Sequence, residues 1–339
     1  MTEGYASAGV DIQKGDKASS IAYRYAKETF ANRKGKIGEP VNLEMGFSGL
    51  LDMGPFYLAF NSDGVGSKTK VAQSLNLHET LGYDLVAMVA DDCVCVGAEP
   101  VSLVNTLDME QVDPVVVDSL MKGLKAAASE AGVAVAGGEI AELRDQVKGY
   151  QWGASLIGVV KKDRVIDGSK IQAGDRIIGL LTDNFRSNGF TLIRRILESS
   201  LGPWWHRDKY DEKMTWGEKV LAPSKIFTPF IMKLIGRFDG TPTAKIHGIA
   251  HITGGGLKHN MERILPKGLE TNVRNLPPIP EVMARVKEMG KISKQEAYQV
   301  WNMGIAMALY TPEPENILQM AKREGINAVE IGVVEKCGA

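Results

Sequence analysis

Asp63-Gly64-Val65-Gly66, followed by Lys68, places a carboxylate and a cation around a glycine turn. Glycine allows the backbone to approach a ligand closely and lets successive N–H groups point at an anion. The segment is not a Walker loop, because Ser67 separates Gly66 from Lys68. A carboxylate repels a phosphate unless a divalent cation lies between them, as Mg²⁺ does when held by one or two carboxylates and substrate phosphates. The alternative interpretation is a tight turn with a solvated Asp63.

A second acidic group lies on a predicted helix. Asp84, Asp91 and Asp92 are separated by spacings of seven and eight residues, which place all three near one helical face. Carboxylates on an otherwise apolar helix cost free energy unless a cation is paired with them. The three carboxylates are therefore either paired with a cation, which would make them part of a binding site, or a solvent-facing stripe.

Two further glycine-rich segments carry one ionisable residue each. Gly137 and Gly138 precede Glu139 at the end of a predicted strand, where a carboxylate indicates either a second metal-phosphate position or a plain turn. His251-Ile252-Thr253-Gly254-Gly255-Gly256 lies between a predicted strand and a helix, which predicts an anion site at the helix N-terminus. His251 has an unperturbed pKa near 6.5 and suits acid–base work, although a lone histidine is more often structural.

Other catalytic patterns are missing from the sequence. It has no serine–histidine–aspartate order, H-E-x-x-H motif, Rossmann fingerprint or kinase signature. The residues therefore indicate a Mg²⁺-dependent nucleotide enzyme that uses acidic and glycine turns in place of a P-loop.

Hydrophobic periodicity and turn residues predict the elements that carry these groups. Leu85, Met88, Val89 and Cys93 form the apolar stripe of a helix that begins near Thr80 and ends at Gly97. A second helix begins at Asp113-Pro114 and ends at Gly132, and a third, 190–198, follows the possible caps Ser187 and Asn188. The predicted strands are 56–62, 101–107, 133–138, 153–162, 176–183, 246–253, 304–312 and 328–335. We leave 201–216 unassigned.

Length and composition bound the class of protein. The 339 residues favour two domains, and the turn-rich segment 161–175 is the best boundary. A net charge of −1 without a basic block excludes the electrostatic footprint of a nucleic-acid binder. We expect no signal peptide and no membrane span, since no apolar run approaches about 18 residues. The three cysteines favour a reduced, cytoplasmic chain in which Cys93 and Cys95 are buried thiols and not zinc ligands.

Ten segments, taken together, resemble the aminoimidazole ribonucleotide (AIR) synthetase family, the phosphoribosylformylglycinamidine cyclo-ligases of purine biosynthesis. They cover nearly the full length in the family's order. The segments are YASAGVDIQKG (5–15), GFSGLLDMG (46–54), SDGVGSK (62–68), GYDLVAMVADDCVCVGAEP (82–100), GGEIAEL (137–143), DGSKIQAGD (167–175), SNGFTLIRRIL (187–197), LAPSKIF (221–227), AHITGGG (250–256) and WNMGIAM (301–307).

The resemblance implies an α/β (α+β) fold of two domains. Residues 1–168 are the expected ATP-binding and dimerisation domain, which pairs strands across a homodimer, and 169–339 are the expected AIR-synthetase-like domain, an α/β sandwich. The implied cofactors are ATP and Mg²⁺. The resemblance implies that Asp63, Asp92 and Glu139 are metal ligands and that Asp63, Lys68, Asp92 and His251 are catalytic. The implied nucleotide-binding residues are Gly64, Gly66, Lys68, Gly137, Gly138 and Glu139. The implied substrate-binding residues are Arg186, Ser187, Asn188, Thr253, Gly254 and Gly255.

The implied reaction is ring closure driven by phosphoryl transfer. An amide oxygen of formylglycinamidine ribonucleotide attacks the γ-phosphate of ATP, which creates an imidate phosphate with a good leaving group. The neighbouring amidine nitrogen then attacks the same carbon, phosphate leaves and the imidazole ring closes. The task of the protein is positioning and charge neutralisation.

Two residues depart from the family's pattern. Arg186 stands where the family usually has a histidine before Ser-Asn-Gly, and it cannot act as a general base because arginine stays protonated. We expect it to hold phosphate or substrate. Asp91 stands where relatives tend to have asparagine, and the added charge either tightens Mg²⁺ binding or raises the pKa of a neighbour.

Related families and one other class compete with this interpretation. Selenophosphate synthetase and thiamine-monophosphate kinase usually carry an aspartate where His251 stands. Selenophosphate synthetase also uses a reactive cysteine on selenide, and this chain has no cysteine before Cys93. The hydrogenase-maturation relatives end in cysteine, whereas this chain ends in KCGA. A nucleotide-binding dimer without catalytic activity is the alternative outside the enzymes, and Arg186 and the 201–216 segment favour it.

Overall fold

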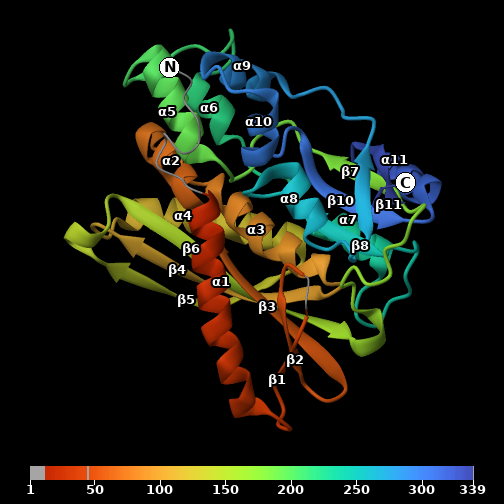
Figure 1. Ribbon diagram of the computed structural model, residues 1–339. Helices are drawn as coiled ribbons and strands as arrows, with labels where there is room; N and C mark the ends of the chain where they lie inside the picture. Colours follow the sequence, from red (N-terminus) through yellow and green to blue (C-terminus); the bar gives the residue numbers. More distant parts are fainter. Residues whose placement is uncertain (1–11, 44–45, 339) are drawn as a thin grey trace.

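The computed structural model describes residues 12–43 and 46–338, and it contains two β-sheets with their covering helices (Figure 1). The first sheet has the order β1-β2-β3-β6-β4-β5 and the second has the order β8-β10-β7-β11-β9. The change from one sheet to the other falls between β6 and β7, across the segment where the sequence predicted a domain boundary. This arrangement confirms the expected α/β (α+β) class.

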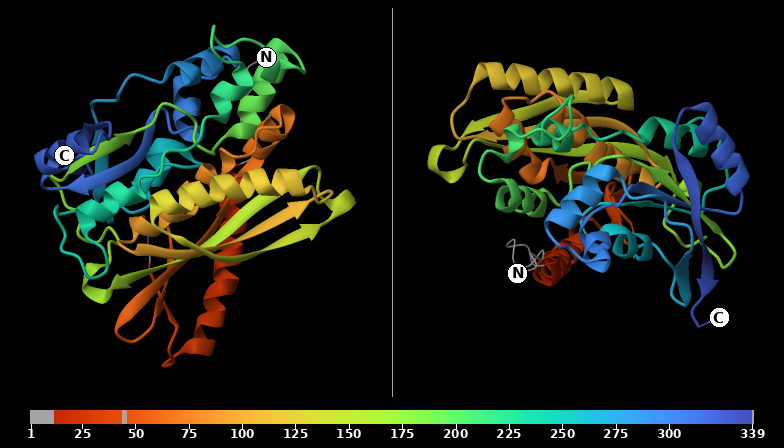
Figure 2. Two further views of the ribbon diagram at one scale, coloured as in Figure 1. Left: turned by 180° about the vertical axis from the view of Figure 1, so that it is seen from behind. Right: turned by 90° about the horizontal axis from the view of Figure 1, so that it is seen from above.

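The first sheet is covered on one face. Its strands are β1 (Glu39–Val41), β2 (Gly49–Asp52), β3 (Phe56–Gly64), β6 (Tyr150–Lys161), β4 (Glu99–Met109) and β5 (Ala134–Glu142), and only the β4–β5 pair is parallel. Helices α3 (Leu81–Cys95) and α4 (Pro114–Ala131) lie across one face, as the view from behind shows (Figure 2). Along β6 the side chains alternate between buried and exposed, because successive residues point to opposite faces.

The second sheet is antiparallel throughout. Its strands are β8 (Gly248–His251), β10 (Ile305–Thr311), β7 (Arg176–Leu181), β11 (Ala328–Lys336) and β9 (Leu269–Val273). Every residue of β10 is buried. The helices of this half are α5 (Phe190–Leu201), α6 (Trp216–Leu221), α7 (Thr228–Ile235), α8 (Gly256–Glu262), α9 (Glu281–Met289), α10 (Lys294–Val300) and α11 (Pro314–Arg323).

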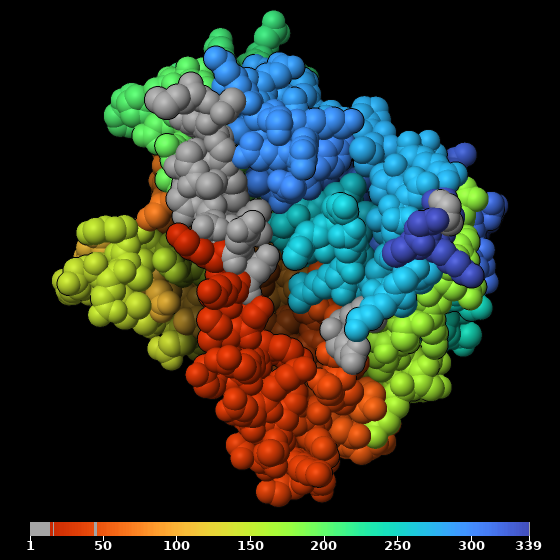
Figure 3. All heavy atoms as spheres, in the orientation of Figure 1, coloured from red at the N-terminus to blue at the C-terminus, as the bar shows by residue number. Residues whose placement is uncertain are grey.

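Two helices near the beginning of the chain differ in their environment. Helix α1 (Ile12–Glu28) crosses the front of the molecule, and its described side chains are exposed (Figures 1 and 3). Helix α2 (Thr69–Leu75) follows the short 3-10 turn η2 (Gly66–Lys68) and packs near α6. Among the described residues, none of the helices has both the length and the apolar composition that a bilayer span requires.

Helix α3 is buried almost all round, which corrects the alternative of a solvent-facing acidic stripe. Asp84 and Asp91 are both fully buried. Gly82 lies so close to α4 that a Cβ atom there would be 2.1 Å from the carbonyl carbon of Gly123. The helix therefore forms the centre of the molecule, in contact with the first sheet, with α4 and α7, and with β8.

Several local predictions need correction. Ser187 and Asn188 do not cap α5; its N-cap is Gly189, and the Ser187 hydroxyl donates instead to the carbonyl of Val65 at 2.7 Å. Strand β5 continues to Glu142, so that Gly137, Gly138 and Glu139 lie inside an edge strand and not in a turn at its end. By contrast, Asp113 caps α4 by accepting from the N–H of Val115, and Gly132 ends that helix in the left-handed conformation, as predicted.

The unassigned segment 201–216 is ordered by aromatic packing. It contains the 3-10 turn η5 (Trp205–Arg207) and a β-bridge between Lys209 and Thr215. The guanidinium of Arg285 lies 4.1 Å from the ring centre of Tyr210 and 4.7 Å from that of Trp216. These cation–π contacts fix the segment to α9.

The three thiols divide into two buried and one exposed, which confirms the prediction of buried helical thiols for Cys93 and Cys95. Burial raises the pKa of both Cys93 and Cys95.

Since the thiolate is the reactive form, we expect a disulfide reagent at pH 8 to modify only Cys337 in the native protein and all three thiols in denaturant. More than one fast-reacting thiol per native chain would contradict the buried packing of α3.

Candidate active site

A chain of four hydrogen-bonded side chains joins α3 to the second half of the molecule. His251, at the end of β8, donates from Nδ1 to Oδ1 of Asp92 at 2.7 Å. Arg186 donates from Nη1 to Nε2 of His251 at 2.6 Å and from Nη2 to Oδ2 of Asp91 at 2.6 Å. Because arginine only donates, Nε2 must be the unprotonated nitrogen of the ring, and the proton must lie on Nδ1 facing Asp92.

Asp91 also caps a helix of the second half. Its Oδ1 accepts from the backbone N–H groups of Phe227 and Thr228 at 3.0 and 2.9 Å and from the Thr228 hydroxyl at 2.9 Å. These donors lie at the beginning of α7, where the helix dipole favours a negative charge. The fully buried carboxylate therefore has partners on both oxygens, including the positive charge of Arg186.

His251 is held neutral and has no ring nitrogen available for proton transfer in this arrangement. Burial, together with the nearby positive charge of Arg186, lowers the pKa of His251 to about 3. Both ring nitrogens are engaged by Asp92 and Arg186. The position of His251 thus favours orienting Asp92, and it does not support the acid–base role that the sequence indicated.

Asp92 and Asp63 form an acidic pair at the centre of the site. Asp92 is 19% exposed, and burial raises its pKa to about 7, against the lowering effect of Arg263 and Arg186. Asp63 lies at the end of β3, where desolvation, with a further contribution from the charge of Asp92, raises its pKa above the usual value. Within the described residues, no group of three or more His, Cys, Asp or Glu side chains is arranged to hold a metal ion. A cation at this position would need further oxygen ligands from a bound phosphate.

Glu139 does not join this pair within one chain. In the register of the sheet, Gly64 pairs with Gly153, Gly153 with Thr106, and Thr106 with Glu139. Glu139 is thus three strands from the Asp63 turn, a separation of roughly 14 Å at about 4.8 Å per strand. Gly138 has a structural reason to be glycine, because a Cβ atom there would be 2.6 Å from the carbonyl oxygen of Asn105.

Lys68 is a buried structural cation, which corrects its expected place at a phosphate. Its ammonium group donates to Oδ1 of Asp84 at 2.8 Å and to the carbonyls of Arg186 and Ala222 at 2.9 and 2.7 Å. Asp84 in turn accepts from the N–H and hydroxyl of Ser224. All three ammonium protons are used, and they join the glycine turn to the second half of the chain.

A cavity of about 570 Å³ lies beside Asp63. Asp63, Gly64 and Gly66 line it, as the sequence analysis expected of a ligand-binding turn. It also contains Lys70, Asp108 and Arg194, which the sequence analysis did not identify. Lys70 and Asp108 lie outside the ten family-like segments, whereas Arg194 lies within SNGFTLIRRIL (187–197). The closeness of Lys70 to the glycine turn and the place of Arg194 in that segment were the available signals.

The expected substrate segments meet at the junction of the two halves. The Ser187 hydroxyl binds the carbonyl of Val65 in the glycine turn, and Gly254 lies next to the side-chain amide of Asn188. Thr253 and Gly255 precede α8, which has only seven residues. Arg186 is fully buried and occupied by Asp91 and His251, so that it does not reach a ligand directly. Substrate contact by Ser187, Asn188, Thr253, Gly254 and Gly255 stays a prediction.

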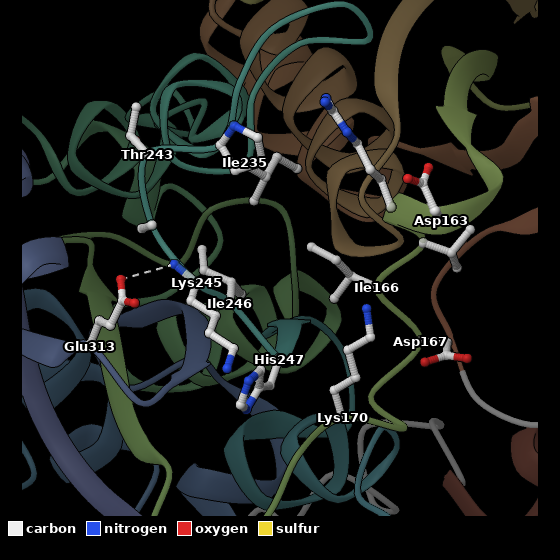
Figure 4. A pocket seen from close by; sticks show the side chains of 14 residues that line it. Asp163, Ile166, Asp167, Lys170, Ile235, Thr243, Lys245, Ile246, His247 and Glu313 are labelled. Carbon is white, nitrogen blue, oxygen red and sulfur yellow. Dashed lines mark hydrogen bonds between the residues drawn. The ribbon is translucent and has the colours of Figure 1, made fainter.

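A second cavity of about 440 Å³ lies where residues 163–170 face the 242–247 segment (Figure 4). Its charged side chains have both signs and include Asp167, Lys170, Lys245 and Glu313. His247, on its wall, is paired through Nδ1 with Asp175 at 2.7 Å. It contains none of the candidate catalytic, metal-binding, nucleotide-binding or substrate-binding residues that the sequence analysis named.

Comparison with known proteins identifies relatives along nearly the whole chain. Residues 48–160 match the family model of the AIR synthase related protein N-terminal domain, and residues 172–339 match that of its C-terminal domain. The chain is 38% identical over 334 residues to a phosphoribosylformylglycinamidine cyclo-ligase of Pyrococcus furiosus, with 98% of this chain and 95% of the relative covered. A protein of the same name from Pyrococcus horikoshii is 39% identical over 334 residues, with the same coverage.

Solved structures share the fold at much lower identity. The hydrogenase maturation protein HypE, solved in complex with ATP, superposes with a TM-score of 0.58 at 18% identity and covers 83% of this chain and 77% of its own. This likeness confirms the architecture of the two halves.

The Arg186–Asp91 pair gives a testable coupling. Asp91→Asn leaves a buried guanidinium without its counter-charge, and we expect it to reduce the free energy of unfolding by about 3–5 kcal/mol. In Asp91→Asn/Arg186→His, which carries the residue types usual for the family, neither charge is left alone. Urea unfolding should therefore show a loss smaller than the sum of the two single losses by about 2 kcal/mol. Strictly additive losses would show that the two residues are not coupled.

Proposed function

Since the chain belongs to the AIR synthase related family and, within it, to the phosphoribosylformylglycinamidine cyclo-ligases, we propose that it closes the imidazole ring of formylglycinamidine ribonucleotide. The products are aminoimidazole ribonucleotide, ADP and phosphate. The observation that carries the proposal is the 38% identity over 98% of the chain to a cyclo-ligase of nearly equal length. Formylglycinamidine ribonucleotide is thus the proposed substrate, and purine biosynthesis is the proposed pathway.

The site supports the phosphoryl transfer that starts ring closure. The amide oxygen of the substrate attacks the γ-phosphate of ATP, and negative charge must be neutralised while the two reactants are held in line. The cavity of about 570 Å³ lies against Asp63 and the glycine turn and contains the cations Lys70 and Arg194. ATP as co-substrate fits this chemistry, and a fold relative has been solved with ATP bound.

Asp63 and Asp92 are the residues that would hold Mg²⁺. The charge of Asp92 helps to raise the pKa of Asp63, so the two carboxylates repel each other, and a divalent cation would relieve that repulsion. When bound, Mg²⁺ would supply charge neutralisation between the carboxylates and the phosphate oxygens. In the register of the single chain, Glu139 lies too far from Asp63 to join the set.

His251 and Arg186 are positioning residues in this proposal. Arg186 holds the ring of His251 in one tautomer, and His251 donates to Asp92. This arrangement directs the other oxygen of Asp92 away from the ring and favours the carboxylate form that a cation requires.

A homodimer is the proposed assembly. Phe60, Val104 and Ile157 are more than 40% exposed and stand on β3, β4 and β6 of the first sheet. Ile21 and Tyr23 on α1 are exposed to a similar extent. Monomeric proteins rarely leave such apolar groups open on one side of a sheet, and a second copy of the chain would cover them. Buried reduced thiols and the metabolic substrate support the cytoplasm as the location.

A coupled assay for ADP release tests the function directly. Purified protein with ATP, Mg²⁺ and formylglycinamidine ribonucleotide should release ADP and form aminoimidazole ribonucleotide in equal amounts. Saturable ATP binding without turnover would instead identify a non-catalytic nucleotide-binding dimer and overturn the proposal.

Asp92→Asn should lower kcat by about 10²–10³-fold, because one electrostatic stabiliser of developing charge typically contributes that much. In the wild type, more Mg²⁺ should be needed for half-maximal activity as the pH falls from 8 to 6, since Asp92 gains a proton through its pKa of about 7 and ceases to be a ligand. Asp118→Asn, on the exposed surface of α4, is the matched control. Near wild-type kcat for Asp92→Asn at saturating Mg²⁺ would contradict the assignment.

Charge on the open face of the first sheet should separate the dimer. We expect Ile157→Asp to give a monomer by light scattering, because a dimer would bury this side chain, whereas Val115→Asp on the exposed side of α4 should leave the assembly unchanged. Circular dichroism should show both variants folded. A dimeric Ile157→Asp protein would place the contact elsewhere.

A further inference from the structure

Arg194 is a half-buried arginine on α5. It lines the cavity of about 570 Å³ together with residues of β3, β4 and β6 of the first sheet. In the part of the chain that the structure describes, no hydrogen bond or ion pair to its guanidinium is recorded, although Glu198, one turn later, attracts it. Five N–H donors in a partly desolvated position represent unused binding capacity for an anion.

The position of Arg194 over the glycine turn is fixed by its own helix. The hydroxyls of Thr191 on α5 and Ser67 on η2 lie 3.0 Å apart and form a hydrogen bond. Thr191 and Arg194 are three residues apart and therefore share one face of α5. The contact that ties α5 to the turn thus also holds Arg194 at the cavity that Gly64 and Gly66 line.

Lys70 adds a second cation to the same cavity. Its ammonium group donates to the carbonyl of Lys148, and desolvation, with the charge of Arg194 as the next cause, lowers its pKa. Burial lowers the pKa of Arg194 as well. Two cations that are partly desolvated and repel each other cost free energy, and a shared anion would offset that cost.

We propose that Lys70 and Arg194 form a binding site for a phosphoryl group, which they hold between the glycine turn of the first half and α5 of the second. The ligand chemistry is a phosphate dianion or the terminal part of a polyphosphate, since the planar fork of arginine matches two phosphate oxygens and lysine contributes a point charge. Asp108, on the β4 side of the same cavity, disfavours a ligand that fills all of it with negative charge. The inference rests on the proposed function, which offers two sources: the 5′-phosphate of the ribonucleotide and the polyphosphate of ATP.

The site also joins the two halves through the ligand. Lys70 belongs to α2, which follows the first sheet's β3, and Arg194 belongs to α5, which follows the second sheet's β7. A phosphoryl group bound by both would hold the junction in the geometry that the acidic pair Asp63 and Asp92 requires. Binding by the two cations should therefore be cooperative, in contrast to two separate surface charges.

The test measures ligand binding and steady-state kinetics for Arg194→Met, Lys70→Met and the double variant. Each protein is titrated calorimetrically with ATP and, separately, with the ribonucleotide. In Arg194→Met we expect the dissociation constant of the ligand that supplies the phosphoryl group to rise about 10- to 100-fold, because a pair of charge-assisted hydrogen bonds is lost. Arg195→Met, at the adjacent exposed position of α5, is the matched control. Arg194→Lys should recover part of the affinity, because it keeps the charge and loses the fork.

Each outcome decides between the sources or against the inference. A rise in KM and dissociation constant for ATP alone assigns the polyphosphate, and a rise for the ribonucleotide alone assigns the 5′-phosphate. Unchanged binding of both ligands to folded Arg194→Met and Lys70→Met overturns the inference even if the wild type closes the ring. Loss of phosphoryl binding in the variants of a protein that shows no turnover would overturn the proposed function and leave this site standing.

Discussion

The structure depends on the burial of three carboxylates of one helix at the junction of two sheets. Asp84 and Asp91 are fully buried on α3, and Asp92 is mostly buried beside them. Removing such charges from water is costly unless each has a partner. Lys68 of the glycine turn pairs with Asp84, and segments of the second half supply the other partners: Ser224 for Asp84, Arg186 and the beginning of α7 for Asp91, and His251 for Asp92. The relative placement of the halves is therefore fixed by charge as well as by apolar packing.

This constraint explains why Arg186 and Asp91 occur together, the two positions at which the resemblance led us to expect a departure from the family's pattern. Arg186 and Asp91 come from distant parts of the chain and meet at 2.6 Å with both side chains fully buried. The extra positive charge and the extra negative charge neutralise each other. Arg186 also adopts a left-handed backbone conformation with φ of 55°, which costs about 1–2 kcal/mol for a residue other than glycine. Its bonds to Asp91, His251 and the Lys225 carbonyl hold it there.

The same junction separates cations with a structural task from cations with a ligand-binding task. Lys68, within the glycine turn, donates three hydrogen bonds to protein acceptors, whereas Lys70 and Arg194 line the cavity. The hydrogen bonds of Lys68 fix the turn, while Gly64, Gly66 and Asp63 line the cavity and remain available to a ligand. Preorganised groups of this kind stabilise transferring phosphoryl groups without reorganising during the reaction.

The sequence by itself determined the class of fold, most of the strands and the acidic character of the site. Local periodicity and turn residues suffice for elements such as α4, whose cap and end were both predicted from Asp113 and Gly132. The sequence also indicated Asp63 and Asp92, because each lies in a distinctive segment, and their role as metal ligands stays a prediction. Only the tertiary structure decided that Lys68 is buried, that Glu139 is three strands from Asp63, and that Arg194 lines the same cavity as the glycine turn. Those outcomes depend on strand register and on contacts between residues more than 100 positions apart, which no local pattern encodes.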